Sequence, residues 1–127
     1  MFETESHTGS PIYHTDVLMY VGTTAIGICY EVIKPEYRDL VKERVERFHD
    51  VIEIKKEQLL NFCGNCLEIP DKDGNLLLAM STAAFNAYTE LQKEKIKKHF
   101  KKIVHSDIST IEKYGGGSAR CMLAELF

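Results

Sequence analysis

The sequence lacks the features that mark membrane proteins and proteins that bind polyanions. None of its apolar runs approaches the roughly 18 residues that cross a bilayer, and its start, Met1-Phe2-Glu3, is not that of a signal peptide. The formal net charge of −3 at pH 7 gives no reason to expect nucleic acid as a partner. The locally basic segment 93–102 also contains Glu94 and is interpreted as a solvated helix face. We therefore expect a soluble, cytoplasmic protein.

The sequence also lacks the repeated ligand spacing of a zinc site. Cys63-Gly64-Asn65-Cys66 is the single C-x-x-C pair, and no H-x-x-x-H accompanies it, so local motifs do not supply four tetrahedral ligands. We expect no metal and no cofactor, and we interpret the cysteines at 29, 63, 66 and 121 as reduced thiols. A redox role for Cys63 and Cys66 is a weak alternative, because it needs a helix that begins at the first cysteine. The helix predicted there ends instead.

The chain is long enough, at 127 residues with 44% hydrophobic content, to bury one core. Residues 1–11 are polar and are expected to form a flexible segment before a domain that spans 12–127. The stretches 17–21 and 25–29 are predicted to be strands around a Gly-Thr-Thr hairpin turn.

A helix is predicted next, because Pro35 suits its first turn. Apolar side chains at helical spacing are expected to form its buried face: Tyr37, Leu40, Val41, Val45 and Phe48. A strand at 51–54 and a short helix at 56–62 complete this first part of the domain.

The second half of the chain repeats this order. Strands are predicted at 66–69 and 76–80, around an Asp-Gly turn. A helix at 89–99, which buries Leu91, Ile96 and Phe100, leads to a strand at 102–105. A short helix at 110–114 and a last strand at 120–126 form a remnant of a third unit. Two and a half ββαβ units of about forty residues indicate an α+β fold, either a partial αβ propeller or another repeat architecture, rather than a doubly wound sheet.

The carboxy-terminal segment places a cysteine beside a glycine run. Gly115-Gly116-Gly117-Ser118 precedes Arg120 and Cys121, at the mouth of the last predicted strand. Glycine lets a ligand approach the main chain closely, so Gly117 and Ser118 are candidate substrate-binding residues. The run is not a phosphate-binding P-loop, because no Gly-Lys-Ser/Thr follows. Cys121 is a candidate nucleophile, provided that its surroundings favour the thiolate.

His14 is the candidate proton carrier. Together with Asp16 it forms an H-x-D pattern, and on an extended chain the two side chains would point to the same side. An imidazole beside a carboxylate can carry protons near neutral pH while the carboxylate holds a cation. His105, at a predicted strand end, is a lesser candidate.

Four stretches carry a resemblance to a known family: 13–19 around His14, 62–67 around the C-x-x-C pair, 103–112, and the Gly-Gly-Gly-Ser-Ala-Arg-Cys end. Together they resemble the C-terminal half of an amidinotransferase-type protein of the guanidine-modifying (pentein) superfamily. The likeness is greatest to arginine-deiminase-related and citrulline-hydrolysing members.

The resemblance implies a five-bladed αβ propeller with the active site on its axis. Cys121 would attack the guanidinium or ureido carbon of an arginine- or citrulline-like substrate, and His14 would act as general acid and base. Asp16 would hold the substrate's nitrogens, and Asn65 would line the pocket. The implied reaction is hydrolysis or amidino transfer through a covalent thiouronium-type intermediate.

Two departures from the family modify this expectation. The closest relatives more often have an amide where this chain has Asp16, and a carboxylate favours a cationic guanidinium over a neutral ureido group. Family members are also roughly twice as long. We therefore expect either a fragment or split product of a longer enzyme, with its N-terminal half missing here, or a truncated homologue that works in an assembly such as a homo-oligomer. The isolated chain is then weak or inactive. A non-catalytic α/β association module that retains the motif is the main alternative.

Overall fold

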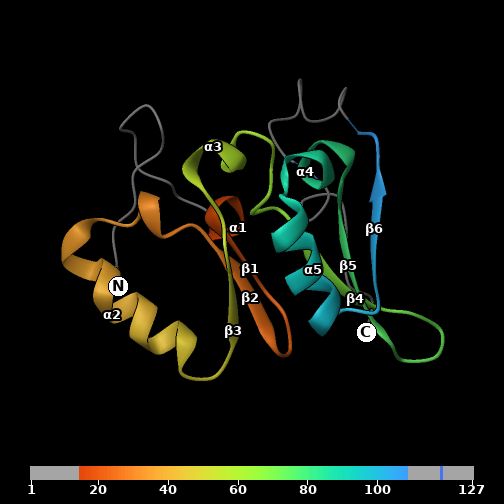
Figure 1. Cartoon of the computed structure of the whole chain (residues 1–127), viewed down its shortest axis with the longest axis horizontal. Coiled ribbons are helices and arrows are strands. Elements are labelled where there is room, and N and C mark those ends of the chain that lie inside the picture. The colour runs from red at the N-terminus through yellow and green to blue at the C-terminus, as the bar shows by residue number, and fades with distance from the viewer. Residues whose placement is uncertain (1–14, 109–117, 119–127) are drawn as a thin grey trace.

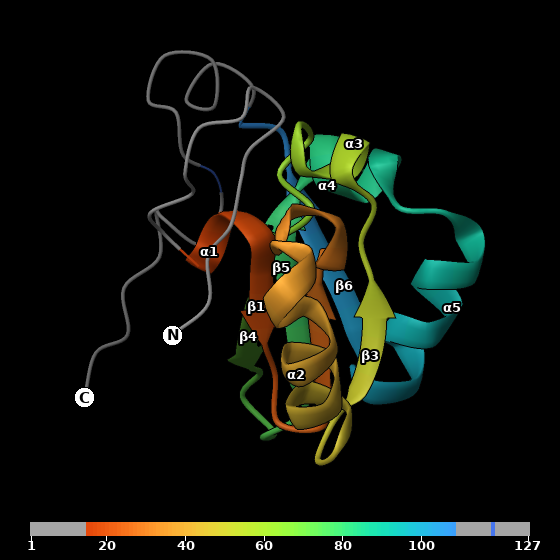
Figure 2. The same cartoon turned by 90° about the vertical axis from the view of Figure 1, so that its left-hand side faces the viewer.

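The computed structural model describes residues 15–108 and Ser118. Within these residues the fold consists of two three-stranded sheets with the strand orders β1-β2-β3 and β4-β5-β6. Figure 1 shows the two sheets beside each other, with α5 between them and α2 on the far side of the first sheet. Figure 2, turned by 90°, shows α2 covering that sheet's outer side. The expected α+β class is confirmed.

The first unit begins with α1 (Thr15–Leu18) and the hairpin of β1 (Met19–Val21) and β2 (Ala25–Ile28). A 3₁₀ turn, η1 (Tyr30–Val32), leads to α2 (Pro35–Glu46), which has its proline at the first helical positions as predicted. The last strand, β3 (Asp50–Glu53), pairs with β2 in parallel, so α2 serves as the crossover that a parallel pair requires.

The second unit repeats this topology after α3 (Lys56–Leu59). The strands β4 (Leu67–Pro70) and β5 (Leu76–Ser81) form an antiparallel hairpin. Two helices follow, α4 (Thr82–Ala87) and α5 (Glu90–His99), and β6 (Lys102–Ser106) then pairs with β5 in parallel. The predicted repeat is therefore confirmed for the two units that the structure describes.

Polar contacts join the two units. Helix α5 of the second unit packs against β3 of the first: His99 Nε2 lies 2.9 Å from Asp50 Oδ2, and Lys95 Nζ lies 3.5 Å from Asp50 Oδ1. Glu68 of β4 accepts hydrogen bonds from the backbone N–H and hydroxyl of Thr23 in the β1–β2 turn, at 2.8 and 2.6 Å. The two sheets are thus held in one arrangement.

A single hydrophobic core runs through both units. Its largest fully buried side chains come from strands, helices and connections of both sheets: Tyr20, Ile28, Ile33, Ile52, Ile54, Leu78, Ile96 and Phe100. The expected burial of Ile96 and Phe100 is confirmed. Among residues 15–108, no helix is long and apolar enough to cross a membrane.

Several local predictions are wrong. Val17 and Leu18 lie in α1 rather than in a strand, and pairing within β1 starts at Met19. Leu40 and Leu91 are exposed, at 49% and 79%, because each helix buries a narrower stripe than its apolar spacing suggests. Phe48, 76% exposed, was expected on the first helix but lies beyond its end at Glu46. Helix α4 was not predicted. The elements predicted at 110–114 and 120–126 lie outside the described residues.

Candidate functional site

The chain enters and leaves both sheets at a common end. Because β2 and β3 are parallel, as are β5 and β6, their carboxyl ends lie together, and the antiparallel β1 and β4 begin at that same end. Helix α1 precedes β1 there, and the turn of residues 63–66 precedes β4. Figures 1 and 2 show α1, α3 and α4 gathered at this end. In open α/β sheets, ligands bind outside the carboxyl ends of the strands.

The turn of residues 63–66 follows a residue with a strained backbone, Phe62. Phe62 adopts a left-handed conformation with φ 64°, at the position after a helix where glycine is usual. Its N–H donates to Leu59 O at 3.1 Å, and the N–H of Cys63 donates to Gln58 O at 3.3 Å, the two bonds of a Schellman motif. Strain of this kind costs on the order of 1–3 kcal/mol and is concentrated at functional sites.

Buried hydrogen bonds fix the turn of residues 63–66 to the core. The Tyr88 hydroxyl donates to Cys63 O at 2.6 Å, and Cys66 Sγ donates to the same oxygen at 3.3 Å. The Cys63 thiol points elsewhere, toward Ala84 O at 3.6 Å. Burial raises the pKa of Cys63 to about 12 and that of Tyr88 well above its usual value. The Cys63 thiol is therefore protonated at neutral pH, and both buried thiols serve the structure of the turn.

The same turn lies directly against α1. A Cβ atom on Gly64 would overlap the carbonyl oxygen of Val17 and would lie 2.9 Å from its carbonyl carbon and 3.1 Å from that of Leu18. No side chain fits between these two backbones, so the position requires glycine. The segment that follows His14 in sequence is thus in contact with the segment that contains Asn65.

The structure describes only some of the predicted site residues. Asn65, in this turn, is 4% exposed, and Ser118 is completely buried. Asp16 lies in α1, so the strand alternation that was expected to align it with His14 does not apply. His14, Gly117 and Cys121 lie outside the described residues.

The sequence reasoning missed the contribution of Tyr88. Its hydroxyl reaches a carbonyl 25 residues earlier in the chain, and no local motif signals such a contact. Tyr20 belongs to the same buried cluster: burial, followed by its electrostatic interactions with Cys66 and Cys63, raises its pKa above the usual value. His105 has a structural role, since its ring stacks on Phe85 at 4.1 Å and Nδ1 lies 2.9 Å from Thr82 Oγ1.

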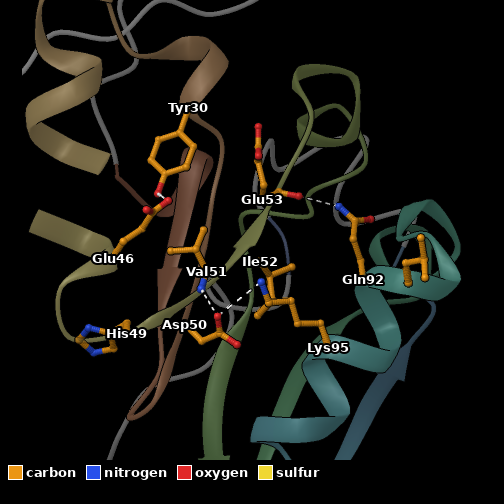
Figure 3. Close-up of a pocket in the computed structure, with 10 residues that line it drawn as sticks. Tyr30, Glu46, His49, Asp50, Val51, Ile52, Glu53, Gln92 and Lys95 are labelled. Carbon is orange, nitrogen blue, oxygen red and sulfur yellow. Dashed lines mark hydrogen bonds and ion pairs between the residues drawn. The ribbon is translucent and has the colours of Figure 1, made fainter. Parts of the chain in front are cut away.

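A groove of about 480 Å³ lies away from this turn, between β3 and α5. Figure 3 shows Tyr30 and Glu46 on one side of it and Gln92 and Lys95 on the other. Several of its charged and polar groups pair with one another: Gln92 Nε2 donates to Glu53 O at 2.7 Å, and Lys95 Nζ lies 3.5 Å from Asp50 Oδ1. None of the predicted site residues lines the groove, which forms part of the junction between the units. In the described part of the chain, no cluster of His, Cys, Asp and Glu could hold a metal ion.

Comparison with known proteins assigns the family. The family model of the eukaryotic N,N dimethylarginine dimethylhydrolases matches residues 1–127. The chain belongs to this family. Its resemblance to the guanidine-modifying pentein superfamily is thereby confirmed. No curated protein sequence matches the chain.

Solved structures with a similar fold include those of ArgZ, an arginine dihydrolase from the ornithine–ammonia cycle in cyanobacteria. The apo structure of ArgZ superposes with a TM-score of 0.68 at 16% identity, over 94% of this chain and 16% of ArgZ. Its N-terminal domain bound to product gives 0.66 at 18% identity, over 87% of this chain and 36% of that domain. This chain thus spans about a third of the ArgZ N-terminal domain and has the fold of that part.

Proposed function

We propose that this chain carries the nucleophile and the acid–base group of a hydrolase that acts on the guanidinium carbon of N,N-dimethylarginine or a related arginine derivative. The family match over the whole sequence is the observation that carries the proposal. The described geometry supports it, because α1, which follows His14, and the turn that contains Asn65 are in contact at the carboxyl end of the sheets.

In the first half of the proposed reaction, the Cys121 thiolate forms a bond to the guanidinium carbon. The tetrahedral adduct then breaks its bond to the dimethylamino nitrogen, to which protonated His14 donates a proton. Neutral dimethylamine leaves, and a thiouronium cation remains on the sulfur. The N-terminal domain of an asparagine-to-serine mutant of ArgZ is covalently bound to a reaction intermediate, which supports a covalent route in this fold.

In the second half, His14, now neutral, accepts a proton from water as the oxygen adds to the same carbon. The carbon–sulfur bond breaks, the ureido group of citrulline forms, and Cys121 returns as the thiolate. The proton released from the adding oxygen is taken up in solution by dimethylamine. The sum is N,N-dimethylarginine and water giving citrulline and dimethylammonium, with neither oxidation nor reduction.

Asp16 is proposed to bind the cationic substrate. A carboxylate pairs with a guanidinium through charge-assisted, bidentate hydrogen bonds, whereas a neutral ureido product offers no charge to pair with. Product release is then favoured over product retention. Asn65, Gly117 and Ser118 are proposed to line the same pocket.

The chain is proposed to act as the C-terminal half, 12–127, of a larger propeller. It spans 36% of the ArgZ N-terminal domain, and substrate positioning can account for roughly 7–11 kcal/mol of an activation barrier. A preceding half or a second copy would supply the remaining substrate contacts. We therefore expect weak turnover, or none, from this chain alone.

One observation favours a second candidate, an association module without catalysis. Leu40 of α2 and Phe48, in the turn after α2, are both large apolar side chains that are exposed, at 49% and 76%. Exposed apolar stripes mark protein interaction surfaces when they are contiguous. The two candidates differ in the chemistry of Cys121.

Alkylation of the native protein by iodoacetamide, mapped by peptide mass spectrometry across pH, tests the proposal. We expect Cys121 to react with an apparent pKa well below the ~8.5 of a free thiol. N,N-dimethylarginine should slow its alkylation more than citrulline does. His14→Ala should move the apparent pKa toward ~8.5, because the imidazolium that stabilises the thiolate is lost.

The chain contains its own controls. Cys29, Cys63 and Cys66 are at most 1% exposed, and burial raises the pKa of Cys29 and Cys63, so they should react only after denaturation. An apparent pKa of Cys121 at or above ~8.5, with no protection by N,N-dimethylarginine, would contradict the hydrolase and support the association module.

A further inference from the structure

The geometry points to Gly64 and Tyr88 as positioning residues: we infer that the turn of residues 63–66 sets the place of α1 and, through it, of the His14 imidazole. The inference rests on the proposed role of His14 as acid and base. It concerns residues that make no contact with substrate and that no local motif assigns to the site.

The first step is the contact between the two backbones. Gly64 is buried, and the space that a Cβ atom would need is taken by the Val17 carbonyl group and by the Leu18 carbonyl carbon. Helix α1 contains only four residues, Thr15–Leu18, and His14 immediately precedes it in sequence. Only Thr15 and Asp16 separate Val17 from His14 in sequence, so we expect a displacement of Val17 to shift His14.

The second step is the rigidity of the turn. Cys63 O accepts the Tyr88 hydroxyl at 2.6 Å and Cys66 Sγ at 3.3 Å, and Asn65 N–H donates to Phe62 O at 2.9 Å. Phe62 holds the left-handed conformation that directs the chain from α3 into this turn. A turn that is hydrogen-bonded from the core cannot move away from α1 at low cost, so α1 has to adapt to it.

The third step is the position of Tyr88 in the fold. Tyr88 follows α4, the helix at the end of β5, and is 3% exposed. Its hydroxyl thus connects the core of the second unit to the turn whose Gly64 contacts α1. A base that must stand within hydrogen-bond reach of its substrate needs such support, because a misplacement of about 1 Å can cost roughly 10²-fold in rate.

Gly64→Ala tests the inference, with Gly74→Ala as the matched control. Gly74 has φ 82° and nothing within 4 Å of its Cβ position, so the same substitution strains the β4–β5 turn without touching α1. We expect Gly64→Ala to shift the amide resonances of residues 15–18 and the imidazole resonances of His14. The pH midpoint of His14 should move as well, while Gly74→Ala leaves all of these in place.

Tyr88→Phe provides a second perturbation that keeps the ring and removes only the hydroxyl. It should shift the resonances of residues 15–18 and His14, even if Gly64→Ala does not fold. In the active assembly, either variant should lower kcat by up to roughly 10²-fold with little change in KM, and should move the limb of the pH profile that belongs to His14.

Unchanged α1 and His14 resonances in both variants would overturn the inference, whatever the activity of the protein. Failure of the proposed function is recognised separately, since it shows in the wild-type chain as a Cys121 thiol without enhanced reactivity. The resonance measurements need no turnover, so the two outcomes are distinguishable.

Discussion

Asp50 is predicted to fasten the second unit to the first. Its carboxylate lies 2.9 Å from His99 Nε2 and 3.5 Å from Lys95 Nζ, and it accepts the Val51 N–H at 3.2 Å. The hydrogen bond from His99, followed by the charge of Lys95, holds the pKa of Asp50 below its usual value. Asp50→Asn keeps the size of the side chain and removes its charge.

The expected loss of stability follows from how exposed Asp50 and its two partners are to solvent. The Asp50 side chain is 49% exposed and that of Lys95 41%, so solvent screens this pair to about 0.2–1 kcal/mol. His99 is less exposed, at 18%, which puts its contribution near the upper end of that range. We expect Asp50→Asn to lower the free energy of unfolding by about 1 kcal/mol, or Tm by roughly 4 °C for a chain of this size.

Urea unfolding at several pH values measures the effect and its sign. A lowered carboxyl pKa in the native state stabilises the fold fully above the unfolded value of about 3.9, and this contribution is lost as the pH falls through the native pKa. The difference between wild type and Asp50→Asn should therefore be present at pH 7, shrink at acid pH and decrease with salt.

Asp73→Asn, the same substitution in the exposed β4–β5 turn, is the control. An Asp50→Asn variant that is no less stable than this control, or a difference that stays constant with pH, would refute the role of Asp50 in the junction.

Two further predictions concern the cap of α5 and the choice of substrate. Thr89→Ala removes the oxygen that accepts the N–H of Gln92 at 3.2 Å, and should cost about 0.5–2 kcal/mol in urea unfolding; Thr89→Ser should restore most of it, and equal losses in both would argue against the cap. Asp16→Asn should reduce the preference for N,N-dimethylarginine over citrulline in binding or protection assays, since it removes the charge that pairs with the guanidinium. An unchanged ratio would remove Asp16 from substrate recognition.

Most elements of the fold could be predicted because their signals are local. Pro35 starts α2 as expected. The turn between β4 and β5 forms where its sequence indicates, since Asp71 Oδ1 accepts the N–H groups of Asp73 at 2.8 Å and Asn75 at 2.9 Å and Gly74 takes the positive φ. Such turns need only residues that are adjacent in sequence.

What could not be predicted depends on distant neighbours. Leu91 has the spacing of a buried residue but is exposed, because α5 directs Ile96 to the core and Gln92 toward Glu53 of the other unit. The role of Gly64 requires knowledge that Val17 lies against it. At the site, residue types predict a chemistry for His14 and Cys121, which lie outside the described residues. The support from Tyr88 could not be predicted, because it depends on a contact between residues far apart in sequence.

The account depends most on a covalent bond between Cys121 and the guanidinium carbon. Intact-protein mass spectrometry after acid quenching, with N,N-dimethylarginine as substrate and the chain in its active assembly, tests this directly. We predict a mass increase equal to the substrate less dimethylamine, located on the Cys121 peptide and absent in Cys121→Ser. Citrulline formation without any such adduct, or with unchanged rate in Cys121→Ser, would contradict the account.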